Sequence, residues 1–209
     1  MPSRLAAAVC LSCFVTTAWA ADTQREALYD IVGDFDHDGT PDRAVLIVEG
    51  PGMTPDDSDL AKDRYWLQDD EQLDLAIYLG AGNVPLDITK PPSFEKDNIN
   101  DHSRNFDWAV PLEVNKAGAL KVTTSEGWGS SHENDETLTI QVNKSVPLLI
   151  GYDLVWELPG ADSASCSIDL QKGNAIKDDG TTKKKFKVKA VNFAFKDWKQ
   201  PLWDKICSP

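Results

Sequence analysis

The sequence predicts an all-β fold, built mainly from antiparallel sheet in a sandwich or a partial propeller, with short helices at most. Three observations predict it. Apolar and polar residues alternate along several short segments, which is the period of a half-buried strand. Clusters of Gly, Pro, Asn and Asp bound these segments. No long segment has a clear helical period. On its length we expect residues 21–209 to form a single domain.

The expected strands follow one another along the chain. They occupy residues 44–48, 73–79, 120–124, 138–142 and 146–156. Lys144 and Ser145 separate the last two strands and predict a hairpin. Farther on, the alternation that begins at residue 185 changes parity near Ala190 and Val191, which indicates either a β-bulge or the end of a strand.

Two kinds of non-strand segment are also expected. Residues 59–73 have room for a short helix, because Leu60, Arg64 and Leu67 lie at helical spacing. Residues 50–63 and 91–107 are rich in Pro, Asp, Asn and Ser, which is typical of long surface loops.

The N-terminus has the pattern of a cleavable signal peptide. Arg4 is the only charged residue before Asp22, and an uncharged run extends from residue 5 to residue 20. This run is short for a membrane span and ends in Ala-Trp-Ala, a small-x-small cleavage pattern. An uncleaved membrane anchor is the alternative. We expect residues 1–20 to be removed, no membrane insertion afterwards, and a periplasmic or secreted mature protein.

The charge of the chain restricts its partners. The formal net charge is −13 at pH 7. Such an acidic chain is unsuited to nucleic acid or to anionic lipid surfaces, because their phosphates would repel it. The charge is compatible with binding of cations or of an unknown, basic protein partner. The alternative is that the charge only keeps the protein soluble.

A disulfide is expected in the mature chain. Only Cys166 and Cys207 remain after residues 1–20 are removed. An isolated pair in an oxidising compartment is most simply a disulfide. A metal or redox site would usually use C-x-x-C spacing, which the mature chain lacks. The bond would fasten the C-terminal tail to the rest of the fold.

One motif has clear chemistry. Residues 34–42 follow the pattern D-x-D-x-D-G-x-x-D. Carboxylates at alternate positions of a tight loop supply the hard oxygen atoms that Ca²⁺ prefers, and Gly39 permits the sharp bend. We expect a structural calcium ion, with the ligands Asp34, Asp36, Asp38, Thr40 and Asp42. Thr40 would contribute its backbone oxygen.

The loop differs from an EF-hand. Val45 stands where the EF-hand has its bidentate glutamate, and strand-like segments rather than helices flank the loop. The expected unit, at about residues 29–80, is therefore a strand, a calcium loop and a strand. His37 points away from the ion in this pattern. The alternative is an acidic β-turn that binds no metal.

These residues resemble a known repeat. The segment GDFDHDGTPDRAVLI at residues 33–47, followed by DLAIYLG at residues 74–80, resembles an FG-GAP or VCBS-type repeat, which places a calcium loop between strands. Only one copy is present, over about 50 residues, whereas a propeller needs several blades.

The C-terminal half has a separate resemblance. LIGYD at residues 149–153 and DLQKGNA at residues 169–175 are similar, in their order, to motifs of small exported bacterial proteins of uncharacterised function. Residues 169–173 depart from that pattern, where the family has Asn-Leu-Leu-Thr-Gly. The resemblances imply a β fold and export, and no reaction.

The sequence favours a binding protein over an enzyme. His102 and His132 lie in polar stretches, and a G-x-S-x-G motif is absent. We predict a calcium-stabilised, non-enzymatic binding protein, with an immunity or inhibitor protein as a specific form. One alternative is an envelope hydrolase that uses an acidic cluster such as residues 69–71 or 133–136. Another is a carbohydrate-adhesion module that uses Trp128.

Overall fold

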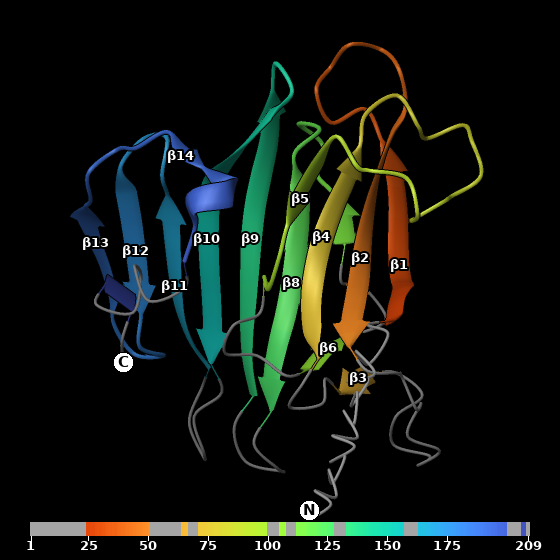
Figure 1. Ribbon diagram of the computed structural model, residues 1–209. Coiled ribbons are helices and arrows are strands. Elements are labelled where there is room, and N and C mark those ends of the chain that lie inside the picture. The colour runs from red at the N-terminus through yellow and green to blue at the C-terminus, as the bar shows by residue number, and fades with distance from the viewer. Residues whose placement is uncertain are drawn as a thin grey trace, which may run out of the picture.

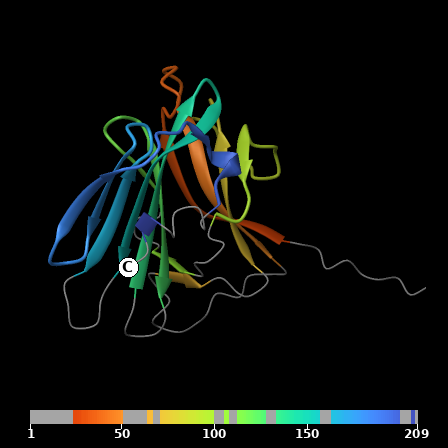
Figure 2. The ribbon, with the colours of Figure 1, turned by 90° about the vertical axis from the view of Figure 1, so that its left-hand side faces the viewer.

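The protein folds into two antiparallel β-sheets that face each other (Figures 1 and 2). The computed structural model describes residues 24–50, 64–66, 71–99, 105–107, 112–127, 133–156, 163–199 and 206–207. The expected signal peptide lies outside these ranges. All strand pairs between the described residues are antiparallel, and no described helix reaches seven residues. The predicted all-β class is therefore confirmed, in its sandwich form.

The smaller sheet has four strands. Their order is β1 (Gln24–Gly33), β2 (Asp42–Gly50), β4 (Gln72–Tyr78) and β5 (Phe94–Lys96). The pairing of β1 with β2 shifts its register between Ala27 and Tyr29, which marks a β-bulge in β1.

The larger sheet has ten strands. Its main path runs through β13 (Lys183–Lys187), β12 (Asn174–Asp178), β11 (Ala164–Asp169), β10 (Val146–Trp156), β9 (Glu133–Asn143), β8 (Leu120–Gly127), β6 (Asn105–Asp107) and β3 (Arg64–Trp66). In addition, β7 (Leu112–Val114) pairs with β8, and β14 (Phe193–Ala194) pairs with β10. The 3₁₀ helix η3 (Phe195–Asp197) follows β14. None of the described helices has the length and apolar character that a membrane span requires.

The five strands expected from sequence are confirmed as β2, β4, β8, β9 and β10, although β4 ends at Tyr78, one residue before the expected end. The hairpin between β9 and β10 is confirmed as well. Lys144 and Ser145 both have positive φ, at 48° and 65°, as a type I′ turn requires. This turn suits hairpins because its twist matches that of the two strands.

Three expectations need correction. The described part of residues 59–73 contains strands rather than a helix, because Tyr65 and Trp66 pair with β6 and aromatic residues favour strands. The range 91–107, expected to be a loop, contains β5 and β6. The parity change near residue 190 marks the end of a strand, since β13 ends at Lys187 and Phe193 begins a strand paired with β10.

The main core lies between the two sheets. Its buried residues include Leu46, Leu75 and Ile77 from the small sheet, and Leu120, Ile140 and Leu149 from the large one. A second apolar cluster covers the outer face of the small sheet. It consists of Val45, Ile47, Ala76 and Tyr78, and the loop after β4 packs on it. Because β2 and β4 are buried on both faces, they contain runs of consecutive apolar residues, at residues 44–48 and 75–78.

The predicted disulfide is confirmed. Cys166 in β11 and Cys207 near the C-terminus are bonded, with their Cα atoms 5.5 Å apart. Both residues are buried in the main core. The bond therefore holds residues 206–207 against the inner face of the large sheet.

Candidate metal centre

The candidate site is the loop between β1 and β2, at the upper end of these strands in Figure 1. It occupies the residues between Gly33, where β1 ends, and Asp42, where β2 begins. His37 and Gly39 have φ values of 63° and 84°, in the left-handed region. Glycine adopts this conformation without steric cost, so Gly39 allows the chain to reverse here.

Hydrogen bonds within the loop hold its backbone around the aspartate carboxylates. The Gly39 N–H donates to Asp34 Oδ2 at 3.1 Å, and the Asp38 N–H donates to Asp36 Oδ1 at 3.2 Å. The Thr40 N–H donates to Asp38 Oδ1 at 2.6 Å. Asp34, Asp36 and Asp38 thus each accept a hydrogen bond from an amide farther along the loop, which is a common way to order an acidic turn.

Asp42 connects the loop to the rest of the small sheet. It is only 1% exposed. One carboxylate oxygen accepts the Phe35 N–H at 2.8 Å, and the other accepts the Gly80 N–H at 2.8 Å. Phe35 lies at the start of the loop and Gly80 follows β4. Through these two bonds, Asp42 connects the start of the loop to the end of a strand that is distant in sequence.

Three of the five predicted ligands converge. Asp34, Asp36 and Asp42 each place one carboxylate oxygen within 4.8 Å of the other two. Ligand oxygens lie about 2.3–2.6 Å from Ca²⁺, so two ligands of one ion can be at most about 5 Å apart. Asp34 Oδ1 is also buried and accepts no hydrogen bond from any described residue. The arrangement fits a divalent cation.

Asp38 is not one of these three converging carboxylates. The Asp38 carboxylate accepts the Thr40 N–H instead. The expected contribution of Thr40 is its carbonyl oxygen, which this bond does not use. The calcium site and its five ligands therefore stay a prediction.

The loop is held by the large sheet as well. Phe35, between the first two aspartates, is 0% exposed and packs in the main core. The His37 ring lies over Gly118, where an added Cβ would be 2.2 Å from His37 Cε1. Gly118 belongs to the turn between β7 and β8. Neither contact was predicted from the sequence, although an apolar residue inside an acidic loop is a usable signal for the burial of Phe35.

A second acidic cluster lies on the outer face of the small sheet. Asp74, Glu95 and Asp97 bring carboxylate oxygens within 4.8 Å of one another. Asp74 is 1% exposed, and this burial raises the pKa of its carboxyl to about 6. The Asn98 N–H, at 2.9 Å from Asp74 Oδ1, opposes the rise because it stabilises the charged form.

Arg25 supplies a positive charge to this cluster. Its guanidinium pairs with Glu95, lies 3.4 Å from Glu49 and lies 3.9 Å from Asp74. These carboxylates raise the pKa of Arg25 against the opposing effect of its burial. Because Arg25 lies within ion-pair distance of Asp74 and Glu95, we interpret the cluster as an ion-pair network rather than as a metal site.

The other candidates from the sequence are separated or undescribed. Asp135 accepts a hydrogen bond from Ser125, whereas Glu136 is buried and accepts one from Tyr152. As neighbours in β9, these two acids point to opposite faces of the sheet. Five of the candidate residues lie outside the described ranges, namely Asp69, Asp70, His102, Trp128 and His132.

Comparisons with known proteins contribute no relative. No family model matches the chain, and neither a curated protein nor a solved structure matches it. The resemblance to an FG-GAP or VCBS-type repeat therefore stays an expectation, and the function has to be inferred from the chemistry of the site.

Proposed function

We propose that this protein is an exported, calcium-stabilised binding protein without catalytic activity. The observation that supports the calcium site most directly is the convergence of Asp34, Asp36 and Asp42, together with the buried, unpartnered Asp34 Oδ1. Three carboxylates at this separation repel one another, and a divalent cation would convert that repulsion into attraction.

The ion would stabilise the joint between the two sheets. The loop contacts the small sheet through Asp42 and the large sheet through His37, whose ring lies over Gly118 in the turn between β7 and β8. Extracellular calcium modules bind with dissociation constants of about 10⁻⁴–10⁻³ M. At 100 times the dissociation constant, binding to the folded state alone adds about 2.7 kcal/mol to the free energy of unfolding.

Surface residues outside the calcium loop would then recognise the binding partner. The formal charge of −13 disfavours nucleic acid and anionic lipid, and it leaves protein partners as the best-suited class. A specific form of the proposal is an immunity or inhibitor protein that blocks a secreted effector in the periplasm. A pull-down from envelope extract that gives no reproducible partner would contradict the binding function.

The calcium site is tested by calorimetry and thermal unfolding of the chain without residues 1–20. We expect measurable heat on titration with Ca²⁺, and a melting temperature that EDTA lowers. Asp34→Asn and Asp36→Ala should each abolish the dependence on Ca²⁺. Asp179→Asn is the matched control, because Asp179 also accepts amide hydrogen bonds in a turn but lies outside the site.

Two results would refute the calcium proposal. One is an unchanged melting curve on chelation, together with no heat of binding. The other is a dependence on Ca²⁺ that survives both substitutions in the loop. A broad screen for hydrolase activity, with and without Ca²⁺, tests the non-enzymatic part separately.

A further inference from the structure

The strand β13 forms one edge of the large sheet (Figure 1). It covers Lys183–Lys187 and, among the described residues, pairs with β12 on one side only. A strand at a sheet edge presents a row of backbone N–H and C=O groups that another extended chain can use. Many peptide-binding proteins recognise a partner in this way, by accepting it as an additional strand.

The hydrogen-bond pattern of the β12–β13 hairpin shows which groups face outward. At the turn, the Asp179 N–H donates to the Thr182 carbonyl, and at the open end the Val188 N–H donates to the Gly173 carbonyl. Bonded pairs alternate along an antiparallel ladder, so residues 184 and 186 direct their backbone groups toward β12. The residues that direct them to the free edge are Lys183, Lys185 and Lys187.

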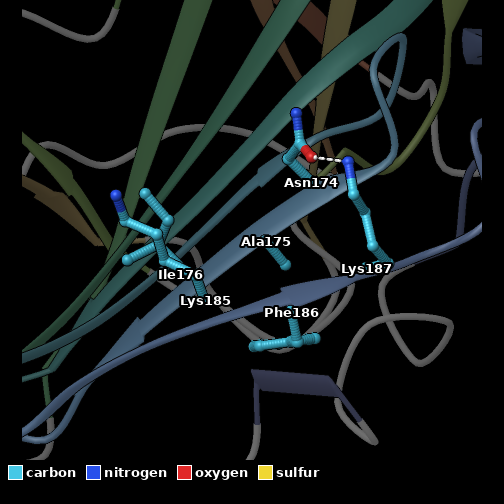
Figure 3. Close-up of a pocket in the computed structure, with 6 residues that line it drawn as sticks. All are labelled: Asn174, Ala175, Ile176, Lys185, Phe186 and Lys187. Carbon is cyan, nitrogen blue, oxygen red and sulfur yellow. Dashed lines mark hydrogen bonds between the residues drawn. The ribbon is translucent and has the colours of Figure 1, made fainter.

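The same three residues each carry a positive charge, and Lys184 adds another on the opposite face of the strand, beside Phe186. The side chains of these three residues lie on one face of the hairpin, where Figure 3 shows Lys185 and Lys187 on the side opposite to Phe186. Lys183 pairs with Asp178 at 3.2 Å, and Lys187 donates to Asn174 at 2.6 Å. Lys185 is exposed, and no described residue forms an ion pair or hydrogen bond with it.

A cavity lies against this hairpin. Its volume is about 470 Å³, and its described lining consists of Asn174, Ala175, Ile176, Lys185, Phe186 and Lys187 (Figure 3). Phe186 is half-buried and packs against the main core. The edge strand therefore offers an apolar contact as well as hydrogen-bonding groups and charge.

We propose that β13 binds an extended acidic segment of a partner protein as an additional antiparallel strand. In antiparallel pairing, partner residues opposite Lys183, Lys185 and Lys187 place their side chains on the lysine face, and the residues between them fall on the face of Phe186. The segment recognised would therefore alternate acidic with apolar residues. This inference rests on the proposed binding function but not on the calcium site.

Charge favours an acidic partner over a second copy of this chain. Lys183, Lys184, Lys185, Lys187 and Lys189 lie within seven positions of a chain whose net charge is −13. Two such edges side by side would place like charges directly opposite one another, which is destabilising. Lysine on an edge strand discourages self-pairing for this reason, while the same charges attract a carboxylate-bearing strand.

The proposal is tested with labelled peptides of seven residues. The probe alternates glutamate with leucine and is followed by fluorescence anisotropy. One control replaces every glutamate with lysine. A second control keeps the glutamates but carries N-methyl groups on the amides that would face β13. We expect saturable binding of the probe, weakened by salt, and at least about tenfold weaker binding of both controls, which lack either the charge or the hydrogen bonds.

Substitutions at Lys185 separate backbone from charge. Lys185→Ala removes the charge but keeps the N–H, and it should weaken binding about threefold, as expected for one exposed ion pair. Lys185→Pro also removes an N–H that faces the free edge, where proline is tolerated, and it should weaken binding at least about tenfold. Lys121→Glu, on the distant strand β8, should leave the affinity unchanged. Circular dichroism of each variant checks the fold.

Several outcomes would overturn the proposal. Equal affinity of Lys185→Pro and Lys185→Ala would exclude strand addition at this edge. Equal binding of the acidic and basic probes would exclude the charge preference, and an edge-to-edge dimer seen by sedimentation would replace the partner with a second copy. If a partner from envelope extract binds the wild type and Lys185→Pro equally, this inference fails while the binding function stands.

Discussion

Replacement of Asp74 by asparagine should stabilise the protein at neutral pH. Asp74 lies in the middle of β4 and is 1% exposed. Its burial raises the pKa of the carboxyl from the ordinary 3.8 to about 6, because the charged form loses its hydration. An asparagine keeps a carbonyl oxygen for the hydrogen bond from the Asn98 N–H, and it carries no charge to bury.

The expected size follows from the two pKa values. A carboxyl with a higher pKa in the folded state binds its proton more tightly there, so it stabilises the fold fully below pH 3.8. That contribution is lost as the pH rises through about 6. The difference between the two values, at about 1.4 kcal/mol for each pH unit, corresponds to about 3 kcal/mol. Because Asp74→Asn also loses the attraction to Arg25, we expect a gain of about 1–3 kcal/mol at pH 7.

Urea unfolding between pH 4 and pH 8 measures this effect as the difference between the variant and the wild type. The gain should be largest above pH 6 and should shrink toward zero near pH 4. Asp169→Asn is the control of opposite sign. The backbone N–H of Lys172 lowers the pKa of Asp169 below the ordinary 3.8, so that variant should be less stable at pH 7. Its loss should fade only as the pH falls below 3.8, and the unfolding series of this control therefore continues below that pH. A gain for Asp74→Asn that does not vary with pH, or a loss at every pH, would refute the role given to burial.

Three further predictions concern other contacts. Asp42→Asn should lower the free energy of unfolding by about 2–3 kcal/mol in excess EDTA. Both carboxylate oxygens of Asp42 accept hydrogen bonds from backbone N–H groups, and the NH₂ group of asparagine would face one of these donors instead. An unchanged urea midpoint would contradict this prediction. Replacement of both Cys166 and Cys207 by alanine should cost about 4 kcal/mol, since the bond closes a loop with a sequence separation of 41, and equal stability of the wild type with and without reductant would contradict it. Gly118→Ala should lower the melting temperature, because its φ is 77° and the new Cβ would collide with His37. His37→Ala should recover part of that loss in the double variant, and no recovery would show that the collision is unimportant.

Part of the candidate site could be predicted from the local sequence pattern. The spacing of four aspartates and Gly39 predicted a tight acidic loop between two strands, and the structure has that loop. Spacing alone did not show that Asp42 binds the Gly80 N–H, because Gly80 lies 38 residues farther along the chain. Nor did it show that Asp34, Asp36 and Asp42 converge while Asp38 turns to Thr40.

The sequence by itself determined the β class, the five principal strands, the hairpin at Lys144 and the pairing of the two cysteines. Each of these follows from residues close in the chain or, for the disulfide, from the lack of another partner. Only the tertiary structure decided that β4 is buried on both faces, that Asp74 is desolvated beside Arg25, and that β13 is an edge strand. These properties depend on which strands become neighbours. Strand order is set by packing between distant segments, and alternation within one segment carries no record of it.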